Sequence, residues 1–224
     1  MDKPLSNTDA AERYSRQRDL VPAERLSQCR ITVVGVGAIG RQVALQLTAI
    51  GASSIQLVDF DTVEVSNLAS QGYLQNDLGH PKVHATAEQC RAINHEVEVV
   101  TLNERFRRSI ETGNVMFCCV DSIVTRKLIW EAVKDRTSFF GDTRMSAEIV
   151  RVLSVANSAG RQHYPTTLFA PEEAHAGSCT AKSTIYTANI AAGLAIGQFT
   201  RWLRGLPVDA DMNLNILTAE LMVA

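Results

Sequence analysis

The stretch RITVVGVGAIG, residues 30–40, decides the fold of this chain. It opens as a short, mostly β-branched run, which predicts a buried strand, and apolar residues at helical spacing begin at Ala38. Between strand and helix stand Gly35, Gly37 and Gly40, in the pattern G-x-G-x-x-G. Such glycines permit a tight turn and let the backbone approach a phosphate or ribose, while the helix that begins there adds free N–H groups and the positive end of its dipole. The stretch therefore predicts a nucleotide-binding turn.

An acidic residue follows the turn at a suitable distance. Asp59 stands 19 residues beyond Gly40, at the end of a second predicted strand, SIQLVD (54–59). A carboxylate there can accept hydrogen bonds from ribose hydroxyls. The alternative is that the glycines serve only close packing of the helix on the sheet. The order and spacing of the strand, the helix and the acidic residue favour a nucleotide site over this alternative.

Strands and helices alternate outward from this turn, which predicts an α/β fold: a Rossmann-like, mainly parallel sheet flanked by helices, with right-handed crossovers. Gly51 is the expected stop of the first helix. The predicted elements are helical residues 11–28 with Pro22 in a first turn, strand 30–35, helix 38–50, strand 54–59, a long polar loop 59–81, helix 83–93, strands 96–103 and 114–120, helix 122–135 and strand 138–144.

The last third of the chain has a different pattern. Residues 147–157 alternate as a strand, and residues 157–180 are rich in Gly, Pro, Ser and His and are expected to be irregular. A helix of small residues is expected over 181–205, and residues 212–223 alternate as one final strand. We expect these C-terminal strands to be antiparallel. Residues 1–224 are predicted to form a single domain, with a nucleotide-binding core at 12–144 followed by a crossover segment, helix and C-terminal strand at 145–224.

Composition excludes several classes of protein. The chain has 224 residues, of which 46% are hydrophobic and 21% charged, which favours a folded globule over disorder. A net charge of −2 gives no electrostatic reason to expect binding to nucleic acid or to a membrane surface. The first residues lack the apolar run of a secretory signal, so a cytoplasmic protein with reduced thiols is expected. The apolar residues 185–199 are fewer than the roughly 20 that a membrane span needs and include Asn189 and Gln198, so a buried helix is expected.

Polar residues that suit a phosphate site follow Asp59. Asp61 comes two residues later, and the polar loop then presents Asn67 and Gln71. Lys82 stands at a predicted helix start, where a cation opposes the helix dipole, so an anionic ligand such as a phosphate is one reason to place it there. The alternative for Lys82 is a solvated surface lysine.

Asp121 ends the predicted strand NVMFCCV, at the edge of the sheet where ligands of parallel α/β proteins gather. An aspartate in that place can bind the Mg²⁺ that accompanies a triphosphate. The alternative is an N-cap for the following helix, and the two roles are compatible.

Five motifs in order resemble the ThiF/MoeB family, which includes the adenylation domains of ubiquitin-activating enzymes. They are RYSRQ (13–17), GVGAIG (35–40), VDFDTVEVSNL (58–68), GHPKV (79–83) and Asp121 followed by Arg126. The resemblance is close over residues 12–144. It implies an ATP-dependent adenylyltransferase, in which the C-terminal carboxylate of a small ubiquitin-like or sulfur-carrier protein ending in Gly-Gly attacks the α-phosphorus of MgATP and gives an acyl-adenylate and pyrophosphate.

The resemblance also implies roles for the residues that match its motifs. Arg16 resembles an arginine that enters the ATP site of the partner subunit, which implies a homodimer with two composite sites. No general base is needed, because the carboxylate is already ionised at pH 7. By position, Gly35, Gly37 and Gly40 hold the nucleotide, Asp59 binds the ribose, Asp61 is a further nucleotide-binding residue, Asn67, Gln71 and Lys82 line the phosphates, and Asp121 holds Mg²⁺.

The chain departs from the family pattern in two places. Where the family usually has N-L-x-R-Q, with the arginine on the outer phosphates, this chain has Ser70. Arg16 from a partner, or Arg41 early in the glycine helix, are the candidates to compensate. The paired C-x-x-C zinc ligands of many relatives are absent, so no zinc is expected. The alternative functions are a non-catalytic nucleotide-binding subunit or adaptor, which Ser70 favours, and an NAD-dependent oxidoreductase that uses the same turn.

Of the five cysteines, Cys179 is the candidate nucleophile. It precedes the long C-terminal helix, whose dipole would lower the pKa of the thiol, and its place resembles that of a reactive cysteine in thiamine-pathway members of the family. The alternative is an unreactive loop cysteine. Arg144, after the fifth predicted strand, is a candidate to bind the tail of the partner protein. The remaining cysteines, at 29, 90, 118 and 119, are expected to be structural.

Overall fold

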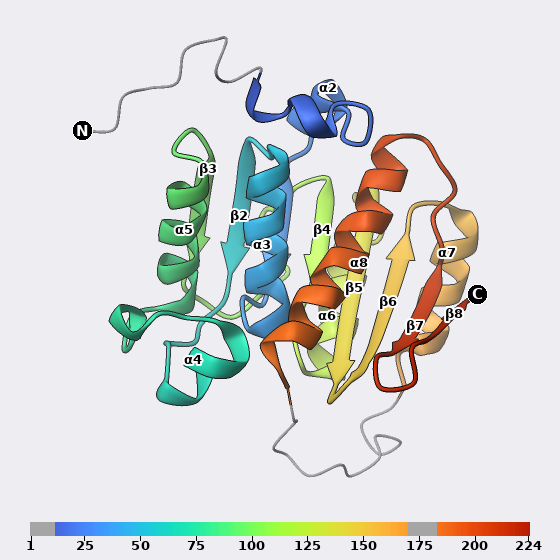
Figure 1. Cartoon of the computed structure of the whole chain (residues 1–224). Coiled ribbons are helices and arrows are strands. Elements are labelled where there is room, and N and C mark those ends of the chain that lie inside the picture. The colour runs from blue at the N-terminus through green and yellow to red at the C-terminus, as the bar shows by residue number, and fades with distance from the viewer. Residues whose placement is uncertain (1–11, 170–182) are drawn as a thin grey trace.

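The computed structural model describes residues 12–169 and 183–224 and contains one eight-stranded sheet (Figure 1). The strand order is β3-β2-β1-β4-β5-β6-β7-β8, parallel from β3 to β5 and antiparallel from β5 to β8. The expected fold class is therefore confirmed. The strands are β1 (Ile31–Val34), β2 (Ser54–Val58), β3 (Glu98–Leu102), β4 (Val115–Cys118), β5 (Phe139–Ser146), β6 (Ile149–Val155), β7 (Asp211–Asn215) and β8 (Glu220–Val223).

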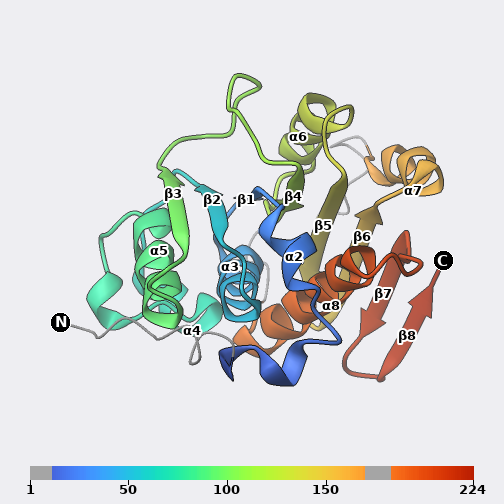
Figure 2. The same ribbon diagram turned by 90° about the horizontal axis from the view of Figure 1, so that it is seen from above.

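Helices cover both faces of the sheet. Figure 1 shows α3 (Ala38–Ile50), α5 (Lys82–Ile93) and α8 (Ile185–Leu203) on one face, and Figure 2 shows α6 (Ile123–Val133) and α7 (Ser158–His163) on the other. Successive side chains of β4 point to opposite faces, so Phe117 joins the core under α3 and α8 while Met116 joins the core under α6. The shorter helical segments are η1 (Ser15–Gln17), α2 (Ala23–Ser27), α4 (Val65–Gln71), η2 (Gln75–Asp77) and η3 (Tyr164–Thr167).

Helix α8 contains the apolar stretch 185–199. Its alanines 188, 191, 192 and 195 are buried in the core that it shares with α3, and small side chains allow such close packing. The expected buried helix is confirmed. Among the residues that the structure describes, no helix is long and apolar enough to cross a membrane.

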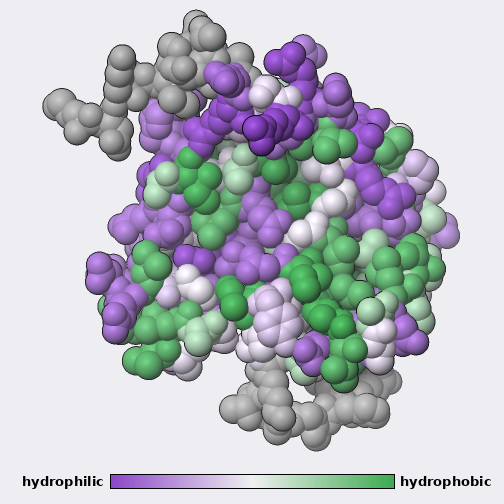
Figure 3. Space-filling model, in the orientation of Figure 1, coloured by the Kyte–Doolittle hydropathy of each residue, from purple (hydrophilic) through white to green (hydrophobic). Residues whose placement is uncertain are grey.

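The C-terminal residues 212–223 form two strands, not the one that alternation predicted. The Asn215 Oδ1 accepts from the backbone N–H of Leu217 at 3.1 Å, and Ala219 has a φ of +57°, so the chain reverses between β7 and β8. The alternation of apolar and polar residues continues through the hairpin, so the sequence pattern does not indicate the turn. Figure 3 shows hydrophobic side chains over this part of the molecule and over α8, and Leu217 and Met222 are 78% and 67% exposed.

Two segments expected to be irregular contain helices. The polar loop 59–81 holds α4, where the Asn67 side chain closes a capping box with Glu64, and also η2. The segment 157–180 begins with α7, capped by the Asn157 side chain, which accepts from Gly160 N at 2.9 Å. The helical region 11–28 is divided into η1 and α2, because Pro22 is the N-cap of α2 and not a residue of its first turn.

The topology fixes where a ligand can bind. β1 lies between β2 and β4, so the chain leaves the sheet in opposite directions from the carboxyl ends of β1 and β4. In parallel sheets this switch point opens a crevice at the strand ends. The glycine turn after β1 and Asp121 after β4 both lie at this edge.

Candidate nucleotide site

The glycines of the turn have different reasons to be there. Gly35 has a φ of +83°, and a Cβ on it would stand 2.9 Å from the carbonyl oxygen of Cys119. A Cβ on Gly40 would lie 1.8 Å from the carbonyl oxygen of Gly35. Close packing is therefore a sufficient reason for glycine at positions 35 and 40, which agrees with the alternative that these glycines serve packing. A Cβ on Gly37, the N-cap of α3, would meet only the Gln71 Oε1 at 3.8 Å, so this glycine keeps the backbone open on the side of α4.

Asp59 joins the turn to the end of β2. Its carboxylate is 9% exposed and accepts from the backbone N–H of Val36 at 2.7 Å and of Asp61 at 2.9 Å. Burial raises the pKa of Asp59, and the two N–H donors only partly offset this effect. Each oxygen has a second lone pair, which leaves acceptor capacity for a ribose hydroxyl.

Lys82 is buried, so the alternative of a solvated surface lysine is wrong. It is the first residue of α5, it is 7% exposed, and its Nζ lies 3.1 Å from the Asp61 Oδ2. Its backbone N–H donates to the Asp61 carbonyl at 2.9 Å. The Asp61 side chain is 47% exposed, so this ion pair stands at the border between the turn and solvent.

Helix α4 brings Gln71 to the turn and uses Asn67 for itself. The Gln71 Oε1 is buried beside Gly37 and has no hydrogen-bond partner among the described residues. The Asn67 Oδ1 accepts from Glu64 N at 3.0 Å and caps the helix, so a phosphate role for Asn67 stays a prediction. The Ser70 hydroxyl donates to the Ser66 carbonyl at 2.9 Å.

Asp121 is exposed, in the loop that follows β4. Because the Cys119 N–H donates to the Val34 carbonyl at 2.8 Å, that loop runs beside the glycine turn. The N-cap of α6 is Ser122, which accepts from Thr125 N at 3.3 Å, so the alternative of Asp121 as the cap is wrong. The described residues contain no cluster of three or more metal-ligating side chains. A single carboxylate still suits Mg²⁺, which takes one or two carboxylates together with substrate phosphates.

Arg16 is not brought to the turn of its own chain. It is exposed in η1, which packs on the C-terminal end of α3: Gln17 Nε2 donates to the Ile50 carbonyl at 2.7 Å, and the Tyr14 ring lies 3.1 Å from where a Cβ on Gly51 would be. The glycine turn is at the other end of α3, about 20 Å away for a helix of this length. Figure 1 shows the N-terminal segment and α4 at opposite ends of the sheet.

The cysteines fall into two groups. Burial raises the pKa of the Cys29, Cys90, Cys118 and Cys119 thiols, to about 11 for Cys29, so the expectation that these four are structural is confirmed. Cys179 lies outside the described residues.

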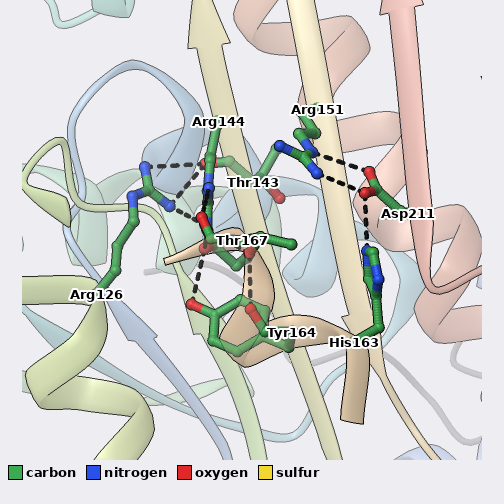
Figure 4. A network of polar contacts seen from close by, with 9 residues as sticks. Arg126, Thr143, Arg144, Arg151, His163, Tyr164, Thr167 and Asp211 are labelled. Carbon is green, nitrogen blue, oxygen red and sulfur yellow. Dashed lines mark hydrogen bonds and ion pairs between the residues drawn. The ribbon is translucent and has the colours of Figure 1, made fainter. Parts of the chain in front are cut away.

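A second polar cluster, which sequence reasoning missed, lies around β5, and Figure 4 labels Arg126, Arg144, Tyr164 and Thr167 among its members. Asp142 is fully buried between the guanidinium groups of Arg126 and Arg144, and the Tyr164 hydroxyl donates to its Oδ2 at 2.8 Å. Arg144 Nη1 also donates to the Thr167 carbonyl at 2.9 Å. Arg144 is thus held inside the protein, and its proposed contact with a partner tail stays a prediction.

These features define an α/β protein with a glycine-rich turn at the switch point of a mainly parallel sheet. The chain belongs to the ThiF family, whose profile matches residues 14–221. It is 34% identical over 143 residues to the adenylyltransferase and sulfurtransferase MOCS3 of Sus scrofa, covering 58% of this chain and 31% of that protein. It is 32% identical over 126 residues to the molybdopterin-synthase adenylyltransferase of Salmonella typhimurium, covering 51% of this chain and 50% of that protein.

Solved structures show the same fold. The crystal structure of PaaA has a TM-score of 0.81 at 22% identity, over 100% of this chain and 75% of that one. The structure of Escherichia coli MccB with ATP has a TM-score of 0.75 at 15% identity, over 95% and 71%. Matched stretches span about a third to a half of the curated relatives.

Proposed function

We propose that this chain is an ATP-dependent adenylyltransferase that activates the C-terminal carboxylate of a small ubiquitin-like or sulfur-carrier protein ending in Gly-Gly. The observation that carries the proposal is the continuous chain of contacts from the turn at Val36 through Asp59 and Asp61 to Lys82. These contacts support a role for Asp59 as the ribose acceptor and for Lys82 as the phosphate cation beside the glycine turn. Membership of the ThiF family supports it.

The residues of the site provide position and charge. The carrier carboxylate attacks the α-phosphorus of ATP, the bond between that phosphorus and the bridging oxygen breaks, and pyrophosphate leaves with the electron pair. No proton is transferred, so the work consists of bringing two anions together and neutralising them. The turn and the N-terminus of α3 hold phosphates, Asp59 orients the ribose, and Lys82 offers its ammonium group. Asp121 would hold Mg²⁺, which supplies further neutralisation of the triphosphate.

The site is proposed to be completed by a second copy of the chain. Arg16 lies at the end of α3 that is remote from its own turn, which supports a role in the partner's site. Arg16→Ala and Lys82→Ala chains should each be inactive alone, whereas an equal mixture should recover up to about a quarter of the wild-type activity through mixed dimers with one intact site. Turnover measured after mixing checks this. A mixture as inactive as its components would exclude composite sites.

Transfer to Cys179 is the finer step of the proposal. The thiol of Cys179 would displace AMP from the acyl-adenylate and form a thioester. A carrier conjugate that excess thiol cleaves by exchange should then form in the natural chain and not in Cys179→Ala, and a conjugate that survives this substitution would rule the step out.

The direct test is exchange of labelled pyrophosphate into ATP, with a panel of small proteins ending in Gly-Gly. Lys82→Ala should reduce exchange by about 10²-fold or more, as loss of a preorganised charge at a phosphate site does. Lys127→Ala, on the exposed side of α6, is the matched control and should change nothing. Absence of exchange with every carrier, together with absence of ATP binding by calorimetry, would overturn the proposal.

Two other outcomes identify the alternatives. ATP binding without exchange indicates the non-catalytic subunit that Ser70 favours, and exchange that appears only in Ser70→Arg supports it further. Preferential binding of NAD over ATP indicates an oxidoreductase.

A further inference from the structure

Arg41 is a buried cation that forms no ion pair with any of the described residues. It lies in the first turn of α3 and is 4% exposed. Its Nε is buried without a hydrogen-bond partner, and none of the ion pairs among the described residues includes its guanidinium. Its one specific contact is the Tyr73 ring, whose centroid is 4.9 Å away.

This placement is unfavourable for the protein alone. An unpaired buried guanidinium loses its hydration without compensation, and a cation in the first turn of a helix opposes the helix dipole. Burial lowers the pKa of Arg41, against the attraction of Tyr73 and of the buried Asp77. The Asp77 carboxylate already accepts from Leu74 N at 2.7 Å. The group remains a charged arginine, because its pKa starts far above neutral pH.

The position of the guanidinium points to the glycine turn. Arg41 Nη1 lies 3.4 Å from where a Cβ on Gly72 would stand, directly after Gln71. Tyr73, on which the guanidinium stacks, donates its hydroxyl to the Val36 carbonyl of the turn at 2.5 Å. The other buried side-chain atom without a partner here, the Gln71 Oε1, lies beside Gly37. Two unsatisfied polar groups thus lie close to the C-terminal end of α4, the Gln71 Oε1 beside Gly37 and the Arg41 guanidinium beside Gly72.

The carboxylates near the turn are a second reason to expect a further cation at a triphosphate site. Asp59, Asp61 and Asp121 bring three carboxylates to this edge, whereas Lys82 shares its positive charge with Asp61 at 3.1 Å and Arg105 stacks on the Phe60 ring at 3.7 Å. A triphosphate added to this set would be repelled. Ser70, on the adjacent helix, brings no charge.

We propose that Arg41 binds the outer phosphates of the nucleoside triphosphate, and that the ligand-free protein holds this guanidinium at a loss of stability until the nucleotide arrives. The inference rests on the proposed function, because that function makes the ligand a triphosphate. The alternative is that Arg41 is a structural residue held by Tyr73.

The variant Arg41→Met distinguishes the phosphate-binding role from the structural role, because it keeps a long unbranched side chain and removes the charge. The ligand-free variant should melt at the same temperature as the wild type or higher. Its Kd for ATP should rise at least tenfold, as expected when charged hydrogen bonds are lost, and its Kd for AMP should stay within twofold, since AMP lacks the outer phosphates. Arg41→Lys should recover part of the ATP affinity. Lys127→Met, on the exposed side of α6, is the control and should change neither the melting temperature nor the two Kd values.

The contrary results are equally distinct. A structural arginine would give an Arg41→Met protein that melts lower or fails to fold, or that loses ATP and AMP affinity alike, and each of these would overturn the inference. Unchanged ATP affinity in Arg41→Met overturns the inference and leaves the proposed function intact. A natural chain that binds neither ATP nor AMP overturns the proposed function itself.

Discussion

Arg126 and Arg41 are withdrawn from water to the same degree, with 5% and 4% of their surface exposed, yet their surroundings have little in common. Arg126 meets the carboxylate of Asp142, which Arg144 and Tyr164 also contact, so this cluster is complete within the protein (Figure 4). Arg41 meets an aromatic ring and no carboxylate.

This difference distinguishes buried charged groups that stabilise the fold from buried charged groups that we expect to bind a ligand. Buried polar atoms in folded proteins nearly always have partners, because desolvation without a hydrogen bond is unfavourable. Around Asp142 the partners of the charged groups are internal, although the neighbouring Thr143 hydroxyl is also buried without a hydrogen-bond partner among the described residues. Around the glycine turn Arg41 and Gln71 lack partners within the described residues, so their partner is expected to come from solution.

Asp142→Asn should give the largest effect on stability. It leaves Arg126 and Arg144 buried without a carboxylate, which reduces the free energy of unfolding by about 3–5 kcal/mol. Urea unfolding of Asp142→Asn and of Arg41→Met measures the difference directly. Asp142→Asn should lower the free energy of unfolding, and Arg41→Met should not. A loss below about 1 kcal/mol in Asp142→Asn would erase the distinction between the two regions.

A smaller effect is expected at Asp211, where β7 meets Arg151 of β6 and His163 of α7. Burial alone would raise the pKa of Asp211, but hydrogen bonds from Arg151 at 2.6 Å and His163 at 2.9 Å more than offset it and lower the pKa. The stability that this carboxylate contributes is therefore present above its ordinary pKa and is lost as pH falls through the lowered value. The melting temperature should fall less between pH 7 and pH 3 in Asp211→Asn than in the natural chain, and equal falls would show that Asp211 contributes nothing.

Local signals in the sequence predicted much of the fold. The glycine turn and the stop of α3 at Gly51, which has a φ of +104°, depend on neighbouring residues and were predicted correctly. Helix α4 was missed because its start depends on the pair Glu64 and Asn67, which reads as polar loop. The β7–β8 hairpin was missed because alternation has the same form on both sides of a turn.

The site was predictable only in part, for a different reason. Asp59 and Lys82 were identified by their spacing from the turn. The cluster around Asp142 joins Arg126 and Tyr164, which lie 16 and 22 residues away on other elements, so no local pattern announces it. That Arg41 has no ion-pair partner among the described residues can be seen only in the packed structure, because no pattern in the sequence marks a missing contact.

Helix α3 is fixed at both ends by close approaches that leave no room for a side chain. At one end Gly40 lies against the carbonyl of Gly35, and at the other the ring of Tyr14 lies on Gly51. The helix is thus packed against the glycine turn at one end and against the N-terminal segment at the other, so a side chain introduced at either glycine would have to displace α3 from its neighbour.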